Sequence, residues 1–342
     1  MRIAVLAIGT RGDVQPLLAL AAGLQQTGRH SVGFIAPDDF GALAREHGLD
    51  FSPFPSARTR AFPNVAFPDL RLGGRYNLWT YTLAERFMQQ FTGRFLNRWR
   101  ERFDLPTISL SAWPYDRLRG RPVPVLFSFS PGVVPRPPEW GEHIHVTGYW
   151  FLEHPPDWQP PADLLAFIES GPPPVYVGFG SMNSRDAQAT TRLVLDALEQ
   201  AGQRGILSTG WGALSDVDMP DSVFAIESIP HAWLFPRMAA VVHHGGAGTT
   251  GAGLRAGVPS ILVPFAGDQP FWGERVKALG VGPAPIPRRR LTARRLADAV
   301  CAAVTGAAMR ERAKAMGERI RSEAGVARAI EVIEGSSGST NN

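Results

Sequence analysis

Short apolar runs alternate with amphipathic stretches at the start of the chain. Residues 3–8 form an all-apolar run that ends at a glycine-containing loop, and residues 14–26 carry apolar side chains at helical spacing. Further apolar runs follow at residues 31–36 and 51–54, separated by a short helical stretch near residues 40–47. Strands that are apolar throughout and alternate with helices are typical of a parallel sheet covered on both faces. The start of the chain therefore predicts a doubly wound α/β domain.

The same alternation returns in the second half of the chain. We expect strands at residues 175–179, 204–209, 223–227, 239–243, 260–263 and 281–286. We expect helices at residues 186–201, 249–256, 270–279, 292–305, 307–323 and 326–334. The prediction is of two domains, residues 1–150 and 151–334, and a flexible tail at residues 335–342. Two doubly wound domains that face one another enclose a cleft at the C-terminal ends of both sheets, where such sheets bind ligands.

The irregular middle part contains one long predicted helix, at about residues 78–103. Aromatic residues recur in it every four positions, at Phe87, Phe91, Phe95, Trp99 and Phe103. Each step of four residues advances about 400°, so this row turns by about 160° over its length and forms no flat face. A helix that lies on a membrane needs such a face. We therefore expect protein or ligand to surround the aromatic row.

Composition and charge narrow the classes of protein. Of the 342 residues, 44% are hydrophobic, and the single cysteine, Cys301, excludes an internal disulfide and a cysteine-based zinc cluster. The net charge of +4 permits an anionic ligand or weak peripheral membrane contact, but it is poor evidence for nucleic-acid binding. The apolar run at the N-terminus is too short for a signal peptide, and no run of 18 apolar residues occurs. We expect a cytoplasmic protein that binds no nucleic acid.

The densest chemical signal is the segment at residues 241–251, where two histidines precede four glycines. An apolar strand ends there, glycines expose backbone N–H groups and a helix begins, which together can hold an anion without a lysine. His244 adds a donor, and the Thr249 hydroxyl can cap the helix and contact a phosphate. We predict a phosphate site rather than a tight turn that serves packing alone. The segment also fits a dinucleotide fingerprint, but it follows a late strand and no acid ends the next one, which disfavours a dehydrogenase.

Two carboxylates outside this segment are candidate functional groups. Asp268 and Gln269 begin a helix one βα unit later, and such a pair can bracket vicinal sugar hydroxyls, although an aspartate there is by itself usually an N-cap. Asp13 lies in a glycine-bounded loop after the first strand. Its alternatives are a helix cap or a general base aimed across the cleft, with a basicity that rises where water is excluded.

Other polar residues have simpler interpretations. Asp216 and Asp218 resemble a metal-binding D-x-D motif but lie in a polar loop, so we expect no metal there. The adjacent His243 and His244 are poorly spaced to share one metal ion. Ser181 follows a strand but lacks the G-x-S-x-G elbow, so we interpret it as a phosphate or sugar ligand rather than a nucleophile.

Taken in order, six motifs resemble those of the UDP-glycosyltransferase superfamily, the family-one enzymes with the GT-B fold, and most closely its sterol-glucosyltransferase and glycopeptide-glycosyltransferase branch. They lie at residues 9–16, 178–182, 229–235, 243–250, 255–259 and 267–270. The resemblance implies two Rossmann-like domains that face one another across a cleft, the first for the acceptor and the second for the nucleotide sugar. It implies inverting transfer of a hexose, such as glucose, from a UDP-sugar to a hydroxyl of an apolar sterol-like or polyketide-like acceptor. No metal or other cofactor is implied.

The resemblance also implies site residues. The segment at residues 244–249 would hold the diphosphate, Asp268 and Gln269 would bind the sugar, and residues 229–233 would frame the nucleobase. Asp13 matches the position of the general base. The implied donor-binding residues are Gly12, Ser181, His231, Trp233, His244, Gly246, Gly248, Thr249, Asp268 and Gln269.

Two departures from the family pattern leave alternatives open. Ser228 and Ala252 lie near the positions where plant members have a tryptophan and a glutamate for uracil and ribose, so UDP and dTDP both stay open. Residues 51–55 run almost directly into residues 59–63, where about two further βα units, or roughly 60 residues, are expected. The alternative hypothesis is therefore a nucleotide-sugar or lipid-binding protein whose catalysis is impaired by its shortened N-terminal domain.

Overall fold

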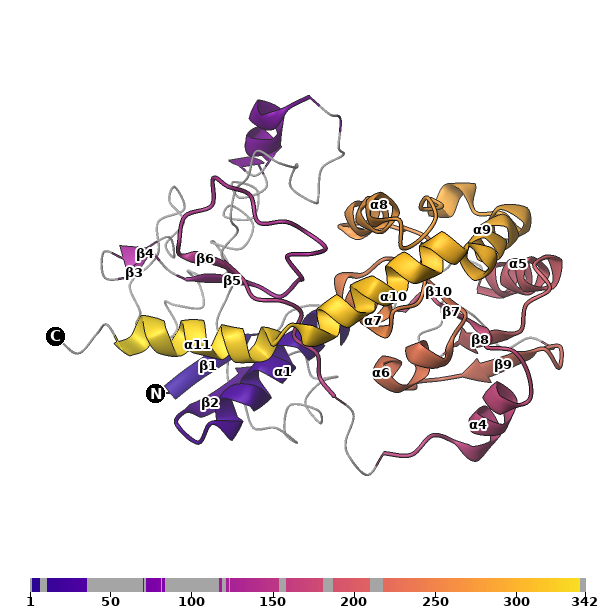
Figure 1. Cartoon of the computed structure of the whole chain (residues 1–342), viewed down its shortest axis with the longest axis horizontal. Helices are drawn as coiled ribbons and strands as arrows, with labels where there is room; N and C mark the ends of the chain where they lie inside the picture. The colour runs from indigo at the N-terminus through magenta and orange to yellow at the C-terminus, as the bar shows by residue number, and fades with distance from the viewer. Residues whose placement is uncertain are drawn as a thin grey trace, which may run out of the picture.

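Parallel strands build both lobes of the molecule, as small pairs in one lobe and as a five-stranded sheet in the other (Figure 1). The computed structural model describes residues 2–6, 11–35, 70, 72–80, 82–83, 117–118, 121–122, 124–153, 158–180, 187–209 and 218–338. In Figure 1, β1, β2 and α1 lie at one end and the larger sheet lies at the other. Two consecutive C-terminal helices, α10 and α11, run across both.

The N-terminal lobe contains the predicted βαβ unit. Strands β1 (Arg2–Leu6) and β2 (Ser31–Ile35) pair in parallel, and α1 (Arg11–Gln26) connects them. The helix begins three residues earlier than expected, so Gly12 and Asp13 belong to its first turn rather than to the preceding loop. Strands β5 (Val125–Phe127) and β6 (Ile144–Val146) form a second parallel pair, which the sequence analysis did not predict.

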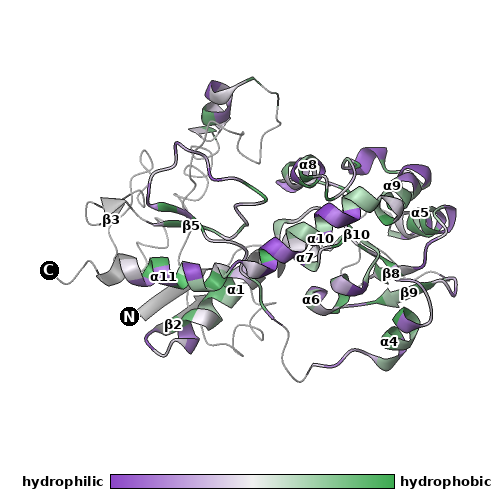
Figure 2. Cartoon of the chain, viewed as in Figure 1, coloured by the Kyte–Doolittle hydropathy of each residue, from purple (hydrophilic) through white to green (hydrophobic). Residues whose placement is uncertain are grey.

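The C-terminal lobe is a five-stranded parallel sheet in the order β11-β10-β7-β8-β9. Its strands are β7 (Val175–Gly178), β8 (Gly205–Ser208), β9 (Val223–Ile226), β10 (Ala240–His243) and β11 (Ser260–Leu262). Each confirms a predicted strand. The strands are almost entirely buried because helices cover both faces, as the uninterrupted apolar runs indicated. Figure 2 shows these strands in hydrophobic colours and the surrounding helices with hydrophilic residues among hydrophobic ones.

Helices precede, connect and follow the strands of this sheet. They are α4 (Ala162–Glu169), α5 (Ala187–Gln200), α6 (His231–Leu234), α7 (Ala247–Ala256), α8 (Gln269–Leu279), α9 (Ala293–Thr305), α10 (Ala307–Ser322) and α11 (Gly325–Gly338). Two 3₁₀ turns, η2 (Phe235–Arg237) and η3 (Arg288–Arg290), complete the lobe. The sequence analysis did not predict α4 and α6, and the other helices fall close to their predicted positions.

The predicted strand at residues 281–286 is wrong. This segment lies beside β11, where Ser260 donates its N–H to the Val281 carbonyl and Ile286 donates to the Leu262 carbonyl. Pro283 and Pro285 have no N–H to continue the ladder, so the segment follows the sheet edge as irregular chain. Its apolar composition indicated burial correctly but not strand pairing.

Helix α11 packs against α1 in the N-terminal lobe, although it follows the larger sheet in sequence. Ala329 joins Leu18, Leu24 and Trp150 in one buried cluster. Gly23 provides the close approach, because a Cβ there would lie 2.7 Å from Val326 Cγ1. Helix α11 also continues to Gly338, beyond its expected end at residue 334.

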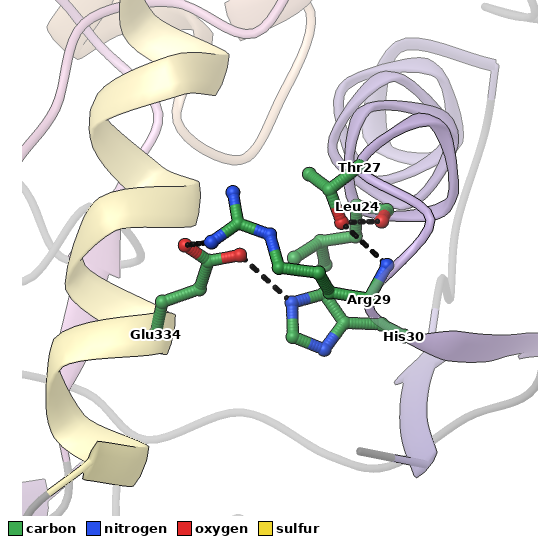
Figure 3. A network of polar contacts seen from close by, with 5 residues as sticks. All are labelled: Leu24, Thr27, Arg29, His30 and Glu334. Carbon is green, nitrogen blue, oxygen red and sulfur yellow. Dashed lines mark hydrogen bonds and ion pairs between the residues drawn. The ribbon is translucent and has the colours of Figure 1, made fainter.

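A polar network fixes the far end of α11 (Figure 3). Glu334 accepts a hydrogen bond from His30 Nε2 at 2.9 Å and pairs with Arg29 Nη1 at 3.1 Å. Thr27 donates its hydroxyl to the Leu24 carbonyl and accepts the N–H of Arg29, which holds the turn after α1. Helix α11 is therefore held against the N-terminal lobe, while α10, which precedes it, packs on α7 of the larger lobe. The division into residues 1–150, 151–334 and 335–342 stays a prediction.

The predicted aromatic helix is described only at its start. Residues 74–80 and 82–83 are helical, with Trp79 exposed, and the aromatic row from Phe87 to Phe103 lies outside the described residues. Within the described ranges, none of the helices combines the length and the apolar character that a bilayer crossing needs.

Candidate functional site

The strand order of the larger sheet marks where a ligand should bind. Chain order reverses between β7 and β10, which are adjacent, with Gly178 opposite His243 in the register. Open α/β sheets bind ligands outside the carboxyl ends of the strands at such a switch point. The loops that follow β7 and β10 there carry Gly180 and His244.

Three loops converge at this point, and the glycines show how closely. A Cβ on Gly180 would lie 3.1 Å from His244 Cε1. A Cβ on Gly245 would lie 3.2 Å from the carbonyl oxygen of Gln269. The loops after β7, β10 and β11 are therefore in direct contact. The structure brings the predicted phosphate and sugar segments together, as the sequence analysis expected for loops that line one site.

The N-terminus of α7 points its backbone donors into this region. Gly246 is its N-cap, with φ −61° and ψ 145°, and no side chain among the described residues caps this end. The N–H groups at positions 247–249 have no acceptor within the helix, and the helix dipole adds positive potential. Thr249 is therefore the third residue of the helix, within its first turn. The expectation that Thr249 caps it is wrong, because the helix begins at Ala247, two residues earlier than expected.

His243 holds the loop between β10 and α7 in place by a hydrogen bond. It ends β10, is fully buried, and its Nδ1 accepts the N–H of Gly245 at 3.1 Å. Gly245 has φ +96°, a left-handed conformation that glycine adopts without strain. Burial lowers the pKa of His243 well below its ordinary value, and the nearby His244 and His231 add to this shift. The ring is therefore neutral, with its proton on Nε2.

Sequence reasoning considered His243 only as a metal ligand and missed this structural role. The available signal was position: His243 is the one polar residue in the apolar run of β10. A strand alternates its side chains between two faces, so a polar residue at the last position can turn back under the loop that follows.

Asp268 and Gln269 lie at the start of α8, and both side chains are held. Gln269 Oε1 accepts the N–H groups of Phe265 at 2.7 Å and Ala266 at 3.1 Å. The amide oxygen of Gln269 is therefore already used within the loop that precedes α8. Asp268 is the N-cap residue but makes no capping bond with its side chain. Its Oδ2 instead accepts the indole N–H of Trp272 at 2.7 Å.

The predicted nucleobase segment packs its rings against its own lobe. His231 stacks on Phe235 with 4.2 Å between ring centroids. Trp233 meets Trp158 edge-on at 5.5 Å, and the Arg237 guanidinium lies 4.3 Å above its ring. One face of the Trp233 ring is therefore covered by a neighbouring cation.

Two of the predicted site residues belong to α1 of the opposite lobe. Gly12 and Asp13 are placed by their backbone in α1, but the Asp13 side chain lies outside the described residues, as do Ser181 and Asp216. In the part of the chain that is described, no group of three histidine, cysteine, aspartate or glutamate residues could hold a metal ion.

Solved glycosyltransferases share this architecture. A kitacinnamycin glycosyltransferase matches with a TM-score of 0.69 and 20% identity, over 97% of this chain and 98% of its own. A calicheamicin glycosyltransferase matches with a TM-score of 0.65 and 18% identity, over 100% of this chain and 99% of its own. These likenesses confirm the predicted fold class, which is GT-B, with two Rossmann-like lobes.

Sequence comparison identifies the family. Residues 3–102 match the Glycosyltransferase family 28 N-terminal domain, and residues 192–333 match the Erythromycin biosynthesis protein CIII-like C-terminal domain. Sterol 3-beta-glucosyltransferases of Cryptococcus neoformans var. neoformans and Emericella nidulans are each 36% identical over 97% of this chain. The chain belongs to the UDP-glycosyltransferase superfamily, as its motifs indicated.

This chain spans only part of those relatives. It covers 27% of the Cryptococcus protein and 30% of the Emericella protein. The Cryptococcus alignment extends over 434 positions, against 342 residues in this chain, so that relative carries residues within the aligned region that have no counterpart here.

Proposed function

We propose that this protein transfers a hexose, glucose in the first instance, from a UDP-sugar to a hydroxyl of an apolar acceptor such as a sterol or polyketide. One observation carries the proposal: the open N-terminus of α7 lies at the sheet's switch point, in contact with the loop that bears Asp268 and Gln269. An anion-binding helix end beside a carboxylate and an amide suits a diphosphate joined to a sugar. The names of the relatives support glucose and a sterol.

The donor lobe would stabilise the leaving group. In our proposal, the N–H groups at positions 247–249 and the His244 ring contact the diphosphate and disperse the negative charge that develops on it. Asp268 and Gln269 hold hydroxyls of the hexose. His231 and its segment frame the nucleobase, which we take to be uracil.

The acceptor lobe would supply the base. Asp13, at the first turn of α1, takes the proton from the acceptor hydroxyl as its oxygen attacks the anomeric carbon. The bond from that carbon to the diphosphate oxygen breaks, UDP leaves with the electron pair, and the configuration inverts. No metal ion is required, because the helix end and His244 supply the positive potential.

Product analysis tests the proposal. UDP-glucose and a pooled set of sterol and polyketide acceptors are incubated with the protein, and products are identified by mass spectrometry and by the anomeric proton coupling in NMR. We expect a β-glucoside, and we expect the rate of its formation to be the same with and without EDTA. Asp13→Asn should lower turnover by about 10²- to 10⁴-fold while UDP affinity, measured by calorimetry, stays the same.

Three outcomes would contradict parts of the proposal. Equal turnover by the Asp13→Asn variant removes Asp13 as the base, and a large loss with EDTA restores a metal. Tight UDP binding without product or donor hydrolysis favours the alternative of a binding protein, which the absence of residues relative to the Cryptococcus enzyme supports.

A further inference from the structure

Trp272 donates a hydrogen bond to the proposed sugar-binding carboxylate. Its indole Nε1 donates to Asp268 Oδ2 at 2.7 Å, one helical turn away along α8. Asp268 is the N-cap residue of α8, yet its side chain makes no capping bond with the helix backbone. The tryptophan therefore directs this carboxylate away from the role that an aspartate at a helix start usually has.

The indole ring is itself held firmly. Trp272 is 6% exposed and belongs to the buried cluster of Val133, Tyr149 and Val276. The ring meets Phe129 edge-on, with 6.3 Å between centroids. A side chain packed on all sides has one rotamer, so its N–H has one direction.

The surroundings of the ring come partly from the segment between β5 and β6. Arg275, one turn further along α8, donates from Nε and Nη2 to the Val133 carbonyl at 2.8 and 2.5 Å. The turn that carries Val133 is itself held in place, because the Ser130 hydroxyl donates to Glu323 Oε1 at 2.6 Å. The segment between β5 and β6 therefore packs on the indole ring and is bonded to α8 one turn beyond it.

We infer that Trp272 is a positioning residue that sets the sugar affinity and selectivity of the donor site by fixing the Asp268 carboxylate. The ligand class is a pyranose with vicinal hydroxyls, carried on a nucleoside diphosphate. With one carboxylate oxygen bonded to the indole, the orientation of the group toward sugar hydroxyls is defined before the donor binds. This inference rests on the proposed function, since it requires that Asp268 contact the sugar.

The test compares two ligands that differ only in the sugar. Calorimetry measures the affinity of the whole chain for UDP and for UDP-glucose without acceptor. Trp272→Phe removes the indole donor, and we expect the affinity for UDP-glucose to fall about 10- to 100-fold, while the affinity for UDP changes less than about threefold. Selectivity for UDP-glucose over UDP-galactose should fall in parallel.

Trp150→Phe is the matched control. Trp150 is also 6% exposed, and its Nε1 also donates a side-chain hydrogen bond, to Thr147 Oγ1 at 2.9 Å. It belongs to the cluster around α1 and α11. The control loses the same ring volume and the same kind of bond. Because the bond of Trp150 is to Thr147 and not to Asp268, the affinities for UDP-glucose and UDP should keep their wild-type ratio.

A second variant covers the case in which Trp272→Phe does not fold. Benzothienylalanine incorporated at position 272 keeps the ring shape and replaces the N–H with sulfur. It should reproduce the loss for UDP-glucose. In an Asp268→Asn background, removing the indole N–H should have little further effect, because Trp272 acts through that carboxylate.

The outcomes separate this inference from the proposed function. An unchanged ratio of UDP-glucose to UDP affinity in both position-272 variants overturns the inference, as does a full additional loss in the Asp268→Asn background. If the wild-type protein binds UDP and the Asp268→Asn variant binds UDP-glucose as tightly as the wild type, the inference is overturned. The proposed diphosphate site is then unaffected. Failure of the wild-type chain to bind either ligand overturns the proposed function and the inference together.

Discussion

A methyl group at Gly246 should weaken UDP binding without unfolding the protein. The backbone there, at φ −61° and ψ 145°, suits any L-residue, so Gly246→Ala creates no backbone strain. The added Cβ, however, would lie 2.6 Å from His244 Nε2. An ordinary contact needs about 3.5 Å, so the His244 ring must move by about 0.9 Å. A histidine ring can move that far, and the contact that we propose between this ring and the diphosphate would then be lost.

The magnitude follows from the bond that is lost. A hydrogen bond to a charged group contributes about 1.5–3 kcal/mol, which corresponds to a 10- to 150-fold increase in the Kd for UDP. Alanine is a poorer N-cap than glycine, which should lower the free energy of unfolding by about 0.5–1 kcal/mol. The effect on binding should therefore exceed the effect on stability.

Calorimetry with UDP and thermal unfolding measure the two effects. Gly335→Ala is the control, because Gly335 lies in α11 with open space around its Cβ position, and UDP affinity should not change. In a His244→Ala background, Gly246→Ala should cost little further affinity. Wild-type UDP affinity in a folded Gly246→Ala variant would refute the reasoning, since the ring would then not be needed for the diphosphate.

Two further predictions concern the polar residues that support the fold. Glu334→Gln weakens the contacts with Arg29 and His30, so urea denaturation should show a loss of about 0.5–1.5 kcal/mol in unfolding free energy, with UDP affinity unchanged; a raised Kd would contradict a purely structural role. Burial lowers the pKa of His243, so the unfolded chain takes up a proton below about pH 6.5 that the native ring excludes. Stability should therefore fall as the pH drops from 7 to 5, by up to about 1.4 kcal/mol per pH unit, and His243→Asn should show a shallower decline. The amide oxygen of the introduced asparagine can still accept the Gly245 N–H. The substitution also removes His243 Nε2, which has no hydrogen-bond acceptor among the described residues. Parallel pH curves for the two proteins would refute the assignment.

A helix or strand could be predicted from the sequence where a pattern within a few residues determines it. The five strands of the larger sheet are apolar throughout because both faces are covered, and this is visible in a window of a few residues. The segment at residues 281–286 is equally apolar and failed as a strand, because proline removes donors that composition alone does not count. Helix boundaries shifted by two or three residues at Arg11 and Ala247 because loop glycines and polar residues joined the first turn.

The residues of the candidate site could be picked out from the sequence by their chemistry, but their hydrogen-bond partners could not be predicted. His244, Asp268 and Gln269 stood out because chemistry-bearing residues follow apolar strands. The hydrogen bond from Trp272 to Asp268 joins residues one helical turn apart, but an indole at that spacing is more often a packing residue than a donor. The two N–H groups that hold Gln269 depend on how the loop after β11 folds back.

The sequence by itself determined that this chain contains βα units, and it predicted a glycine-rich anion loop and a sugar-binding pair, because hydrophobic periodicity and backbone conformational freedom are properties of short segments. Only the tertiary structure decided that β7 and β10 are neighbours, that Gly180, His244 and Gln269 lie within contact distance, and that α11 returns to α1. Strand order and helix docking result from burying apolar faces that are distant in sequence. No local pattern specifies which faces those are.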